Sequence, residues 1–463
     1  MNEIESALLS AISKHPKMPL IIAYSGGVDS QVLLHAFASL IQNKSTSSEL
    51  LNSVTVCHVN HGLSVNASTW QEFAQQQCQR VNLPLKVCQV NVQVKVQHSL
   101  EALARDARYQ ALHSVYDEAS LILTGHHRDD QAETFLLALK RGSGLKGLSA
   151  MAEETKQTKD WLVRPLLNIS RAQIIAYAKA HDLTWVEDES NSDVRFDRNF
   201  IRNDILPLLT KRWPSITNTI NRSSEHCREG QVLLNELAAA DLELCQDEVN
   251  SFKVEALINL SQARFNNLIR YFLALKHYLM PSTEQLQQLH QQLGAAKEKN
   301  PAVKVGENYF RRYKGALYLT ADFNDVSAWQ VNIDLHEHCT NIELPDNLGQ
   351  LQLIVGQNEV SENRAPIINK QHSIIAPSKD QVITVRFEHN NPKCLPDYRQ
   401  HSRSLKKVLQ ELDIPPWQRK RIPFLYFDDI LVAVMGHFVC QPYLSQDSSP
   451  QGKELSITIT WTS

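Results

Sequence analysis

The sequence predicts an α/β protein whose N-terminal part is a doubly wound parallel sheet. Short apolar runs alternate with longer helical patterns between residues 19 and about 140, which is typical of βαβ units. Polar strings follow directly after three of these runs, at residues 25–30, 58–62 and 125–130. Because ligands bind beyond the carboxyl ends of the strands in such sheets, we expect the three strings to meet at one crevice.

The individual elements of this part follow from the same patterns. Apolar, β-branched runs predict four strands, at Leu20–Tyr24, Val54–Val59, Leu85–Val90 and Leu121–Gly125. Helical patterns between them predict three helices, at Asp29–Leu40, Ser68–Val81 and Ser99–Tyr116. Asn66 or Ser68 is a suitable N-cap for the second helix.

The pattern changes after Pro207. Residues 215–300 lack strand alternation and predict helices, notably at Leu257–Leu279 and Thr283–Leu293. A short β segment over Val303–Leu319 follows, and then a polar linker or bridging strand over Ala321–Asp334.

From about residue 340 short strands dominate, with one helix expected at Ser404–Leu412. A chain of 463 residues exceeds what one hydrophobic core usually organises. We therefore expect three domains: a catalytic α/β domain at 1–215, a helical domain at 216–325 and a small mixed α+β domain at 335–463.

Composition narrows the class of protein. Hydrophobic residues make up 43% and charged residues 21% of the chain, as in soluble globular proteins. No apolar stretch approaches the roughly 20 residues that a membrane span needs, and the acidic N-terminus does not resemble a signal peptide. Eight cysteines occur singly without a CxxC pair. Their spacing argues against a zinc ribbon, an iron–sulfur site or a disulfide framework. We expect a reduced, cytoplasmic protein without membrane contact.

Charge is distributed unevenly along the chain. The net charge is −3, but residues 397–421 hold seven Lys or Arg against three acidic residues, and Arg311–Lys314 is a second basic cluster. Solvated helix faces explain such clusters equally well. Local basic patches on a mildly acidic protein also suit a selective RNA-binding protein.

The string SGGVDS has the residues of a phosphate-binding loop. Two adjacent glycines let the backbone approach a ligand closely, and the following helix N-terminus favours an anion. The lysine of the Walker loop is absent and Asp29 stands in the loop, which suits magnesium bridging the protein and phosphate oxygens. This loop predicts a pyrophosphate site, formed by Ser25, Gly26, Gly27, Val28, Asp29 and Ser30.

Two further strings follow strands. His58 and His61 in HVNHGL form a nucleotide-contacting loop, a structural turn or, with less support, part of a zinc site. The string GHHRDDQAET begins with Gly125 and His126 at a strand end. In it, Asp130 and Glu133 lie three residues apart on one helix face. In one interpretation Asp129 and Asp130, in the first turn of this helix, cap it. In the other, Asp130 and Glu133 bind magnesium or a cationic substrate such as the lysine ammonium.

Basic residues follow in three other places. Arg105 and Arg108 lie on a predicted helix, and Lys140, Arg141 and Lys146 lie in or beside a glycine-rich loop that suits a phosphodiester backbone. Surface ion pairs and an ordinary helix-ending loop are the alternatives. Arg198 and Arg202 belong either to a capped helix or to an arginine cluster that neutralises a transferring adenylate.

Taken together, these strings resemble the tRNA(Ile)-lysidine synthetase family. The resemblance rests on SGGVDS, HVNHGL, EALARDARY, GHHRDDQAET, RGSGLKGL, Arg164–Leu167, the EDESN…FDRNFIRN segment and residues 404–429. It implies an N-type ATP pyrophosphatase domain of the adenine nucleotide alpha hydrolase-like fold. It also implies an enzyme that modifies the first anticodon cytidine of tRNA(Ile) with anticodon CAU. ATP adenylates the cytosine C2 oxygen and releases pyrophosphate, and the amine of free L-lysine then displaces AMP.

The resemblance also implies roles for single residues. Magnesium lies at Asp29 and Asp130, and the loop 25–30 binds ATP together with His58, His61, Gly125 and His126. The catalytic residues are Asp29, Asp130, Glu133 and Arg198. Residues that contact RNA or the adenylate are Arg105, Arg108, Lys140, Arg141, Lys146 and Arg202.

Two other functions compete with this one. A tRNA sulfurtransferase of the same fold shares adenylation but usually needs paired cysteines or a cluster, and the isolated cysteines count against it. A noncatalytic RNA-binding protein would not need Asp29 and Asp130. The sequence leaves the oligomeric state open, with a homodimer as one alternative.

Overall fold

The chain, seen in a computed structural model, divides into two compact units, Met1–Leu237 and Ala238–Ser463. The structure describes residues 1–42, 54–62, 64, 66–90, 100–294, 302–334, 339–356, 370–378, 380–445 and 456–462. Within these ranges, none of the helices has the length and apolar character of a membrane span. The division into three domains stays a prediction.

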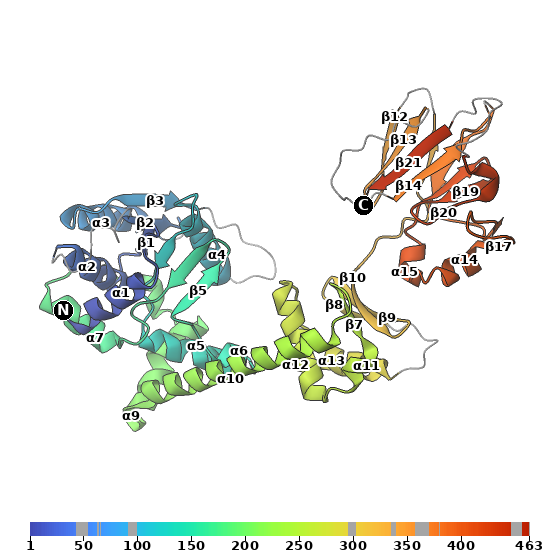
Figure 1. Ribbon diagram of the computed structural model, residues 1–463. Helices are drawn as coiled ribbons and strands as arrows, with labels where there is room; N and C mark the ends of the chain where they lie inside the picture. The colour runs from blue at the N-terminus through green and yellow to red at the C-terminus, as the bar shows by residue number, and fades with distance from the viewer. Residues whose placement is uncertain are drawn as a thin grey trace. The chain divides into compact units, whose positions relative to one another are not determined.

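A six-stranded sheet forms the centre of the first unit, in the order β3-β2-β1-β4-β6-β5 (Figure 1). Its strands are β1 Leu20–Ala23, β2 Val54–Asn60, β3 Leu85–Gln89, β4 Leu121–Leu123, β5 Glu154–Gln157 and β6 Asp160–Val163. All neighbours are parallel except β5 and β6. The four predicted strands are confirmed, whereas β5 and β6 were not predicted.

Helices cover both faces of this sheet. They are α1 Glu3–Ser13, α2 Val28–Gln42, α3 Ala67–Arg80, α4 Leu100–His113 and α7 Arg171–Ala180. Leu20 and Ile22 of β1 share a core with α1, α2, α3 and α7, whereas Ile21 points to the opposite face and shares a core with Leu112 of α4. This alternation confirms the doubly wound arrangement. The predicted start of α4 at Ser99 lies outside the described residues.

Helices beyond the sheet complete the first unit. They are α5 Arg128–Lys140, α6 Leu145–Leu148, a short 3₁₀ turn at Glu189–Ser192, α8 Asp197–Phe200, a π-helical turn at Ile201–Ile205, α9 Leu206–Arg212 and α10 Ile216–Cys245, of which the part up to Leu237 belongs to this unit. Ala132, Ile201, Leu206 and Ile220 form an apolar cluster that packs α5 against the segment 201–220. Pro207 has no N–H that could donate a hydrogen bond to the carbonyl of Asn203. This is consistent with the π-helical turn at Ile201–Ile205, which is wider than an α-helical turn.

The second unit begins with a small sheet and three helices. The sheet has the order β7-β10-β9-β8, with β7 Ser251–Lys253, β8 Ala302–Val305, β9 Asn308–Tyr313 and β10 Ala316–Ala321. The helices are α11 Val254–Ile258, α12 Gln262–Leu275 and α13 Thr283–Leu293. The predicted single helix over Leu257–Leu279 is wrong, because it breaks where the Ser261 side chain accepts a hydrogen bond from Arg264 N and caps α12. An all-helical 215–300 is also wrong, because β7 lies within it.

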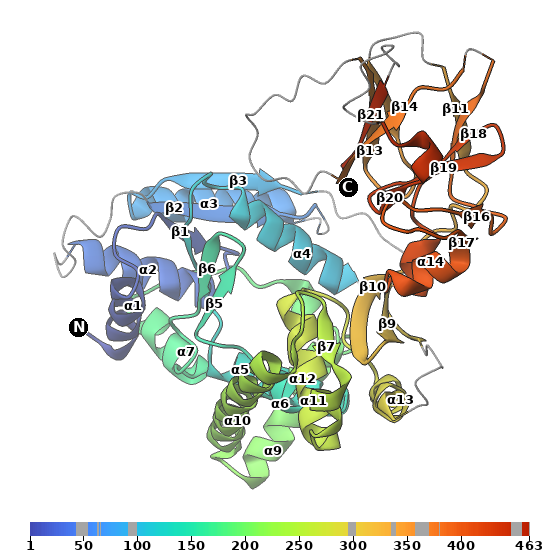
Figure 2. The ribbon, with the colours of Figure 1, turned by 45° about the vertical axis from the view of Figure 1, so that its right-hand side comes forward.

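Antiparallel sheets dominate the rest of the second unit (Figure 2). One has the order β11-β15-β18-β19-β20, one β12-β13-β21-β14, and β16 pairs with β17. The two larger sheets share one apolar core. The predicted helix is confirmed as α14 Leu405–Glu411, followed by α15 Pro416–Arg419 and a 3₁₀ turn at Gln441–Tyr443. The strands are β11 Gln330–Ile333, β12 Cys339–Glu343, β13 Gln350–Val355, β14 Lys370–Ile375, β15 Ile383–Arg386, β16 Lys393–Cys394, β17 Arg403–Ser404, β18 Phe424–Phe427, β19 Ile430–Val434, β20 Phe438–Val439 and β21 Ser456–Thr462.

Candidate active site

The loop between β1 and α2 gathers its polar groups around one point. Ser30 Oγ accepts hydrogen bonds from the N–H groups of Gly26 at 3.1 Å and Ser25 at 3.3 Å, and it donates to Gly27 O at 2.9 Å. Gly26 has φ of +88°, and a Cβ there would lie 2.8 Å from Val186 Cγ2. The loop therefore needs glycine at this position, and the N–H groups of Ser25 and Gly26 both point toward Ser30 Oγ.

The end of β4 lies directly against this loop. A Cβ on Gly125 would lie 3.0 Å from the carbonyl carbon of Asp29 and 3.2 Å from Ser30 N. The loop after β2 joins on the other side, where the His58 ring Nδ1 donates to Tyr24 O at 3.1 Å. The structure thus brings the three predicted strings together, although Leu63 of HVNHGL lies outside the described residues.

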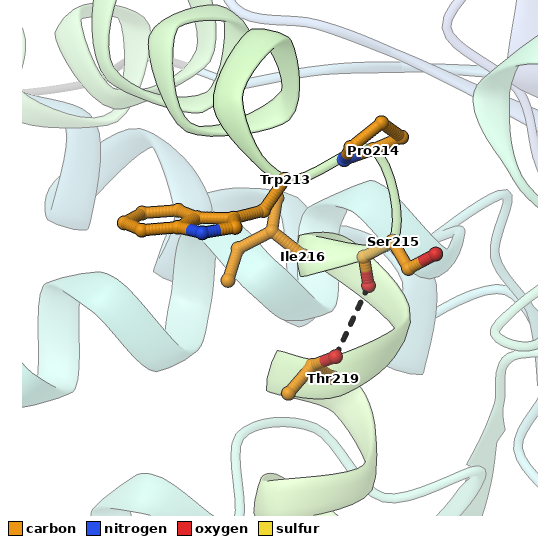
Figure 3. A pocket seen from close by; sticks show the side chains of 5 residues that line it. All are labelled: Trp213, Pro214, Ser215, Ile216 and Thr219. Carbon is orange, nitrogen blue, oxygen red and sulfur yellow. Dashed lines mark hydrogen bonds between the residues drawn. The ribbon is translucent and has the colours of Figure 1, made fainter.

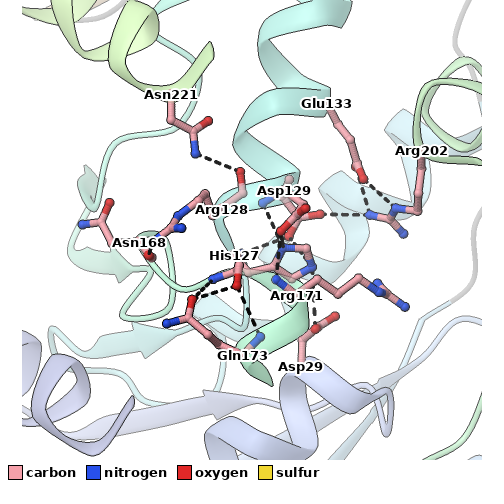
Figure 4. A network of polar contacts seen from close by, with 12 residues as sticks. Asp29, His127, Arg128, Asp129, Glu133, Asn168, Arg171, Gln173, Arg202 and Asn221 are labelled. Carbon is pink, nitrogen blue, oxygen red and sulfur yellow. Dashed lines mark hydrogen bonds and ion pairs between the residues drawn. The ribbon is translucent and has the colours of Figure 1, made fainter. Parts of the chain in front are cut away.

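The N-terminus of α5 carries a buried histidine among three carboxylates (Figure 4). His127 Nδ1 accepts from Asp129 N at 3.2 Å, and Asp130 Oδ2 accepts from His127 N at 3.0 Å. His127 Nε2 lies 3.6 Å from Asp29 Oδ1 and 3.6 Å from Asp130 Oδ2. Asp130 therefore does cap the helix, as one of the alternatives predicted, and it also faces the loop 25–30.

Two arginines pair with the acidic side chains of α5. Arg198 Nε donates to Glu133 Oε2 at 2.8 Å, and Arg198 Nη2 donates to Asp130 Oδ1 at 3.2 Å. Arg202 Nε donates to Glu133 Oε1 at 2.6 Å, and Arg202 Nη2 donates to Asp130 Oδ1 at 3.0 Å. Asp130 and Glu133 are buried. The arginines that the sequence assigned to different roles therefore share one ion cluster, and both oxygens of Glu133 are engaged within it.

Burial and charge move the pKa values of these groups in opposite directions. Burial raises the pKa of Asp29, although the neighbouring His127 acts to lower it. Burial also acts to raise the pKa of Asp130, but His127 and Arg198 outweigh it and lower this pKa to about 2. Burial lowers the pKa of His126 to about 3. Asp130 is consequently a carboxylate, and His126 a neutral imidazole, at neutral pH.

The other predicted RNA or adenylate contacts lie apart from this ion cluster. Arg108 Nε donates to His61 Nε2 at 3.5 Å; burial, together with Arg108, lowers the pKa of His61 to about 4. Arg105 lies over the Tyr109 ring at 5.2 Å. Lys140 pairs with Asp197 at 2.5 Å on the surface, and Arg141 and Lys146 are exposed.

The loop 25–30 contains one candidate ligand for a metal ion, Asp29. Across the described residues, no group of three or more His, Cys, Asp or Glu has metal-binding geometry, so the zinc alternative for His58 and His61 gains no support. Asp29 Oδ1 is a buried oxygen without a hydrogen-bond partner among the described residues. An unpaired carboxylate oxygen beside a phosphate loop is a suitable ligand for a hard cation.

A hollow of about 500 Å³ lies elsewhere, between α9 and α10 (Figure 3). It is lined by Trp213, Pro214, Ser215, Ile216 and Thr219. None of the residues predicted for the site lines it.

The basic clusters of the second unit are partly neutralised by their own neighbours. Arg399 and Arg403 both pair with Glu411, and Lys314 pairs with Asp413. Lys406 and Lys407 are exposed on α14. The number of basic residues in 397–421 therefore overstates the charge that this segment presents to a partner.

One residue of the site was not singled out from the sequence. His127 stands beside His126 in the quoted string, but a histidine is an unusual N-cap. The signal that could have indicated its role is its place between a strand end and the Asp129–Asp130 pair.

Known sequence families match three stretches of the chain. Residues 1–209 match a family described as a PP-loop domain, residues 252–318 a TilS substrate binding domain and residues 383–456 a TilS substrate C-terminal domain. The fold and these matches define a PP-loop protein with an additional substrate-binding region.

Individual relatives are similar over nearly the whole length. A tRNA(Ile)-lysidine synthase of Serratia proteamaculans (strain 568) is 40% identical over 458 residues, which cover 98% of this chain and 97% of the relative. One of Edwardsiella ictaluri (strain 93-146) is 41% identical over 91% of both chains. One of Coxiella burnetii (strain RSA 493 / Nine Mile phase I) is 38% identical over 91% of this chain and 89% of the relative. The chain belongs to the tRNA(Ile)-lysidine synthase family.

The ion cluster predicts how two charge-removing substitutions differ. Glu133→Gln should lower the free energy of unfolding by about 3 kcal/mol, because two partly buried guanidiniums lose their shared partner. Asp197→Asn should cost less than about 1 kcal/mol, because its pair with Lys140 is exposed. Urea titration of both variants measures the difference. Equal effects would show that the cluster of Glu133 is no more important than a surface pair.

Proposed function

We propose that this chain ligates lysine to C2 of the first anticodon cytidine in tRNA(Ile) with anticodon CAU. ATP is consumed to AMP and pyrophosphate, and the product is lysidine. The observation that carries the proposal is the contact of the loop 25–30 with the start of α5, where the His127 ring lies 3.6 Å from both Asp29 and Asp130. The near full-length similarity to tRNA(Ile)-lysidine synthases supports the same reaction.

The first step requires a site for the pyrophosphate of ATP. The amides and hydroxyls of residues 25–30 would bind it, as their convergence on Ser30 Oγ indicates. Asp29 and Asp130 would hold Mg²⁺, which when bound neutralises charge on the phosphate oxygens. Neutral His126, together with His58, His61 and Gly125, would line the nucleotide part of the site.

The second step requires an oriented, unprotonated lysine amine. Asp130 is our candidate to orient it, because its lowered pKa keeps it ionised at neutral pH. A carboxylate with a pKa of about 2 is a weak base, so its role is to position the amine by a charge-assisted hydrogen bond rather than to store its proton. Glu133 would act through Arg198 and Arg202, which it holds in place.

The arginines provide positive charge for the reacting groups. Arg198 would stabilise the adenylate, since its guanidinium lies at the carboxylates that face the loop. Arg105, Arg108 and Arg202 would contact the adenylate or the RNA, and Lys140, Arg141 and Lys146 would bind the tRNA backbone. The protein would work in the cytoplasm, where its substrates occur, as a monomer or a homodimer.

A tRNA sulfurtransferase is the weaker alternative, because the relatives named above are lysidine synthases. The described cysteines form no disulfide, although Cys57 Sγ and Cys88 Sγ lie 3.8 Å apart on neighbouring strands. Lysine dependence separates the two reactions. With ATP and tRNA alone, a lysidine synthase can form its adenylate once, and repeated AMP release requires lysine. A steady rate of AMP formation that is the same with and without lysine would contradict the proposal.

Asp130→Asn tests the amine-orienting role in the same assay. The variant should lower the rate of lysine-dependent AMP release by about 100-fold at saturating lysine and magnesium, because it loses a charged group that acts on the nucleophile. The Asp197→Asn variant is the control and should keep the wild-type rate. Near-normal lysidine formation by Asp130→Asn would exclude this role.

The two exposed lysines of α14 test the role of the second unit in tRNA binding. Replacing both Lys406 and Lys407 with Gln should weaken tRNA binding and reduce the dependence of log Kd on log salt by about one unit for each phosphate that is no longer neutralised. Binding of ATP should be unchanged. Lys179→Gln, an exposed lysine of α7, is the matched control. An unchanged salt dependence would place the tRNA-binding surface elsewhere.

A further inference from the structure

His127 lies at the junction of the two halves of the candidate site without a part in the chemistry described so far. It is buried, with 1% of its surface exposed. It is the N-cap of α5, and its ring lies between that helix and Asp29 at the start of α2. A buried imidazole among carboxylates needs an explanation, because polar groups without partners are costly in the interior.

The hydrogen bonds of the ring determine where its proton lies. Asp129 N–H donates to Nδ1 at 3.2 Å, so Nδ1 is an acceptor and carries no proton. Asp129 Oδ2, at 3.7 Å from Nδ1, is itself the acceptor for Arg171 N–H at 2.8 Å. The neutral ring must therefore carry its proton on Nε2.

This Nε2–H points toward two carboxylates from different elements. It lies 3.6 Å from Asp29 Oδ1 and 3.6 Å from Asp130 Oδ2. His127 Nε2 and Asp29 Oδ1 are both buried and without a hydrogen bond to any described residue. At 3.6 Å the Nε2–H makes no hydrogen bond, but its dipole attracts both carboxylates in a medium of low dielectric constant.

We propose that His127 is a positioning residue that holds Asp29 and Asp130 in one shared arrangement through its Nε2–H. The loop 25–30 and helix α5 would then keep the same position relative to each other through both steps of the reaction. This inference rests on the roles proposed above for Asp29 and Asp130. The competing explanation is that His127 is a helix cap and nothing more.

Two substitutions distinguish the contribution of Nδ1 from that of Nε2. In His127→Asn the amide oxygen can replace Nδ1 as the cap, but no donor reaches the carboxylates. In His127→Gln the amide nitrogen can replace Nε2, but the cap is lost. We expect His127→Asn to keep the wild-type melting temperature. Its rates of ATP–pyrophosphate exchange and of lysine transfer to adenylated tRNA should both fall by about 10- to 100-fold, with KM for tRNA unchanged.

His127→Gln should show the opposite pattern. It should recover most of both rates, while its melting temperature falls by about 2–4 °C, because a lost N-cap costs about 1 kcal/mol. The matched control is His113→Asn, a histidine of the same unit whose Nδ1 lies 2.5 Å from buried Asp160 Oδ2. That variant should lose stability and keep both rates.

Several results would overturn the inference. If folded His127→Asn keeps both rates, or if His127→Asn and His127→Gln lose them equally, the Nε2–H does not position the carboxylates. If Asp29→Asn and Asp130→Asn keep both rates, the proposed roles of these two residues fail instead. Should both His127 variants unfold, the ¹⁵N spectrum of the wild-type imidazole decides. A proton on Nε2 supports the inference, and a proton on Nδ1 excludes it.

Discussion

The ion cluster of Asp130, Glu133, Arg198 and Arg202 is the interaction on which the candidate site depends. Carboxylates buried to this extent are stable only when they are paired and hydrogen-bonded. The two arginines lie one helical turn apart and reach the same two carboxylates. If residues 197–205 moved away from α5, Asp130 and Glu133 would lose their ion-pair partners, which is costly for buried carboxylates. The apolar cluster around Ile201 adds to this constraint.

This cluster also determines the chemistry that its members can perform. Arg198, together with the hydrogen bond from His127 N–H, keeps Asp130 ionised despite its burial. At Asp29 burial outweighs the effect of His127 and of the nearby arginines, so its pKa is raised. Two neighbouring carboxylates thus differ in acidity because of their surroundings. Binding of a cation would favour the ionised form of Asp29.

Much of the first unit could be predicted from the sequence, because the carboxyl ends of parallel strands lie at the same edge of a sheet. Strings that follow strands β1, β2 and β4 must emerge at one edge. Glycine marks the close contact, since Gly125 leaves room for the Asp29 backbone. The pairing of Glu133 with Arg202 could not be read in this way. The two residues are 69 positions apart, and a lone glutamate or arginine in a sequence gives no sign that it is buried in an ion pair rather than exposed on the surface.

The second unit was less predictable for related reasons. Its apolar pattern over 257–279 is continuous, but one serine that caps α12 divides it into two helices. Local hydrogen bonds of this kind compete with helix propensity. They do not change the spacing of the apolar residues, so the hydrophobic pattern does not show them. Basic clusters were also ambiguous, since Glu411 pairs with two arginines of its own neighbourhood. A count of charges cannot separate internal pairs from a surface that binds RNA.

The most direct measurement is the transfer of labelled lysine to tRNA. The protein is incubated with ATP, labelled lysine and tRNA(Ile) with anticodon CAU, and the label on the RNA is counted. A transcript with uridine in place of the first anticodon cytidine is the control. We expect ATP-dependent label on the first tRNA and none on the control. Absence of label, or equal label on both RNAs, would contradict the proposed reaction.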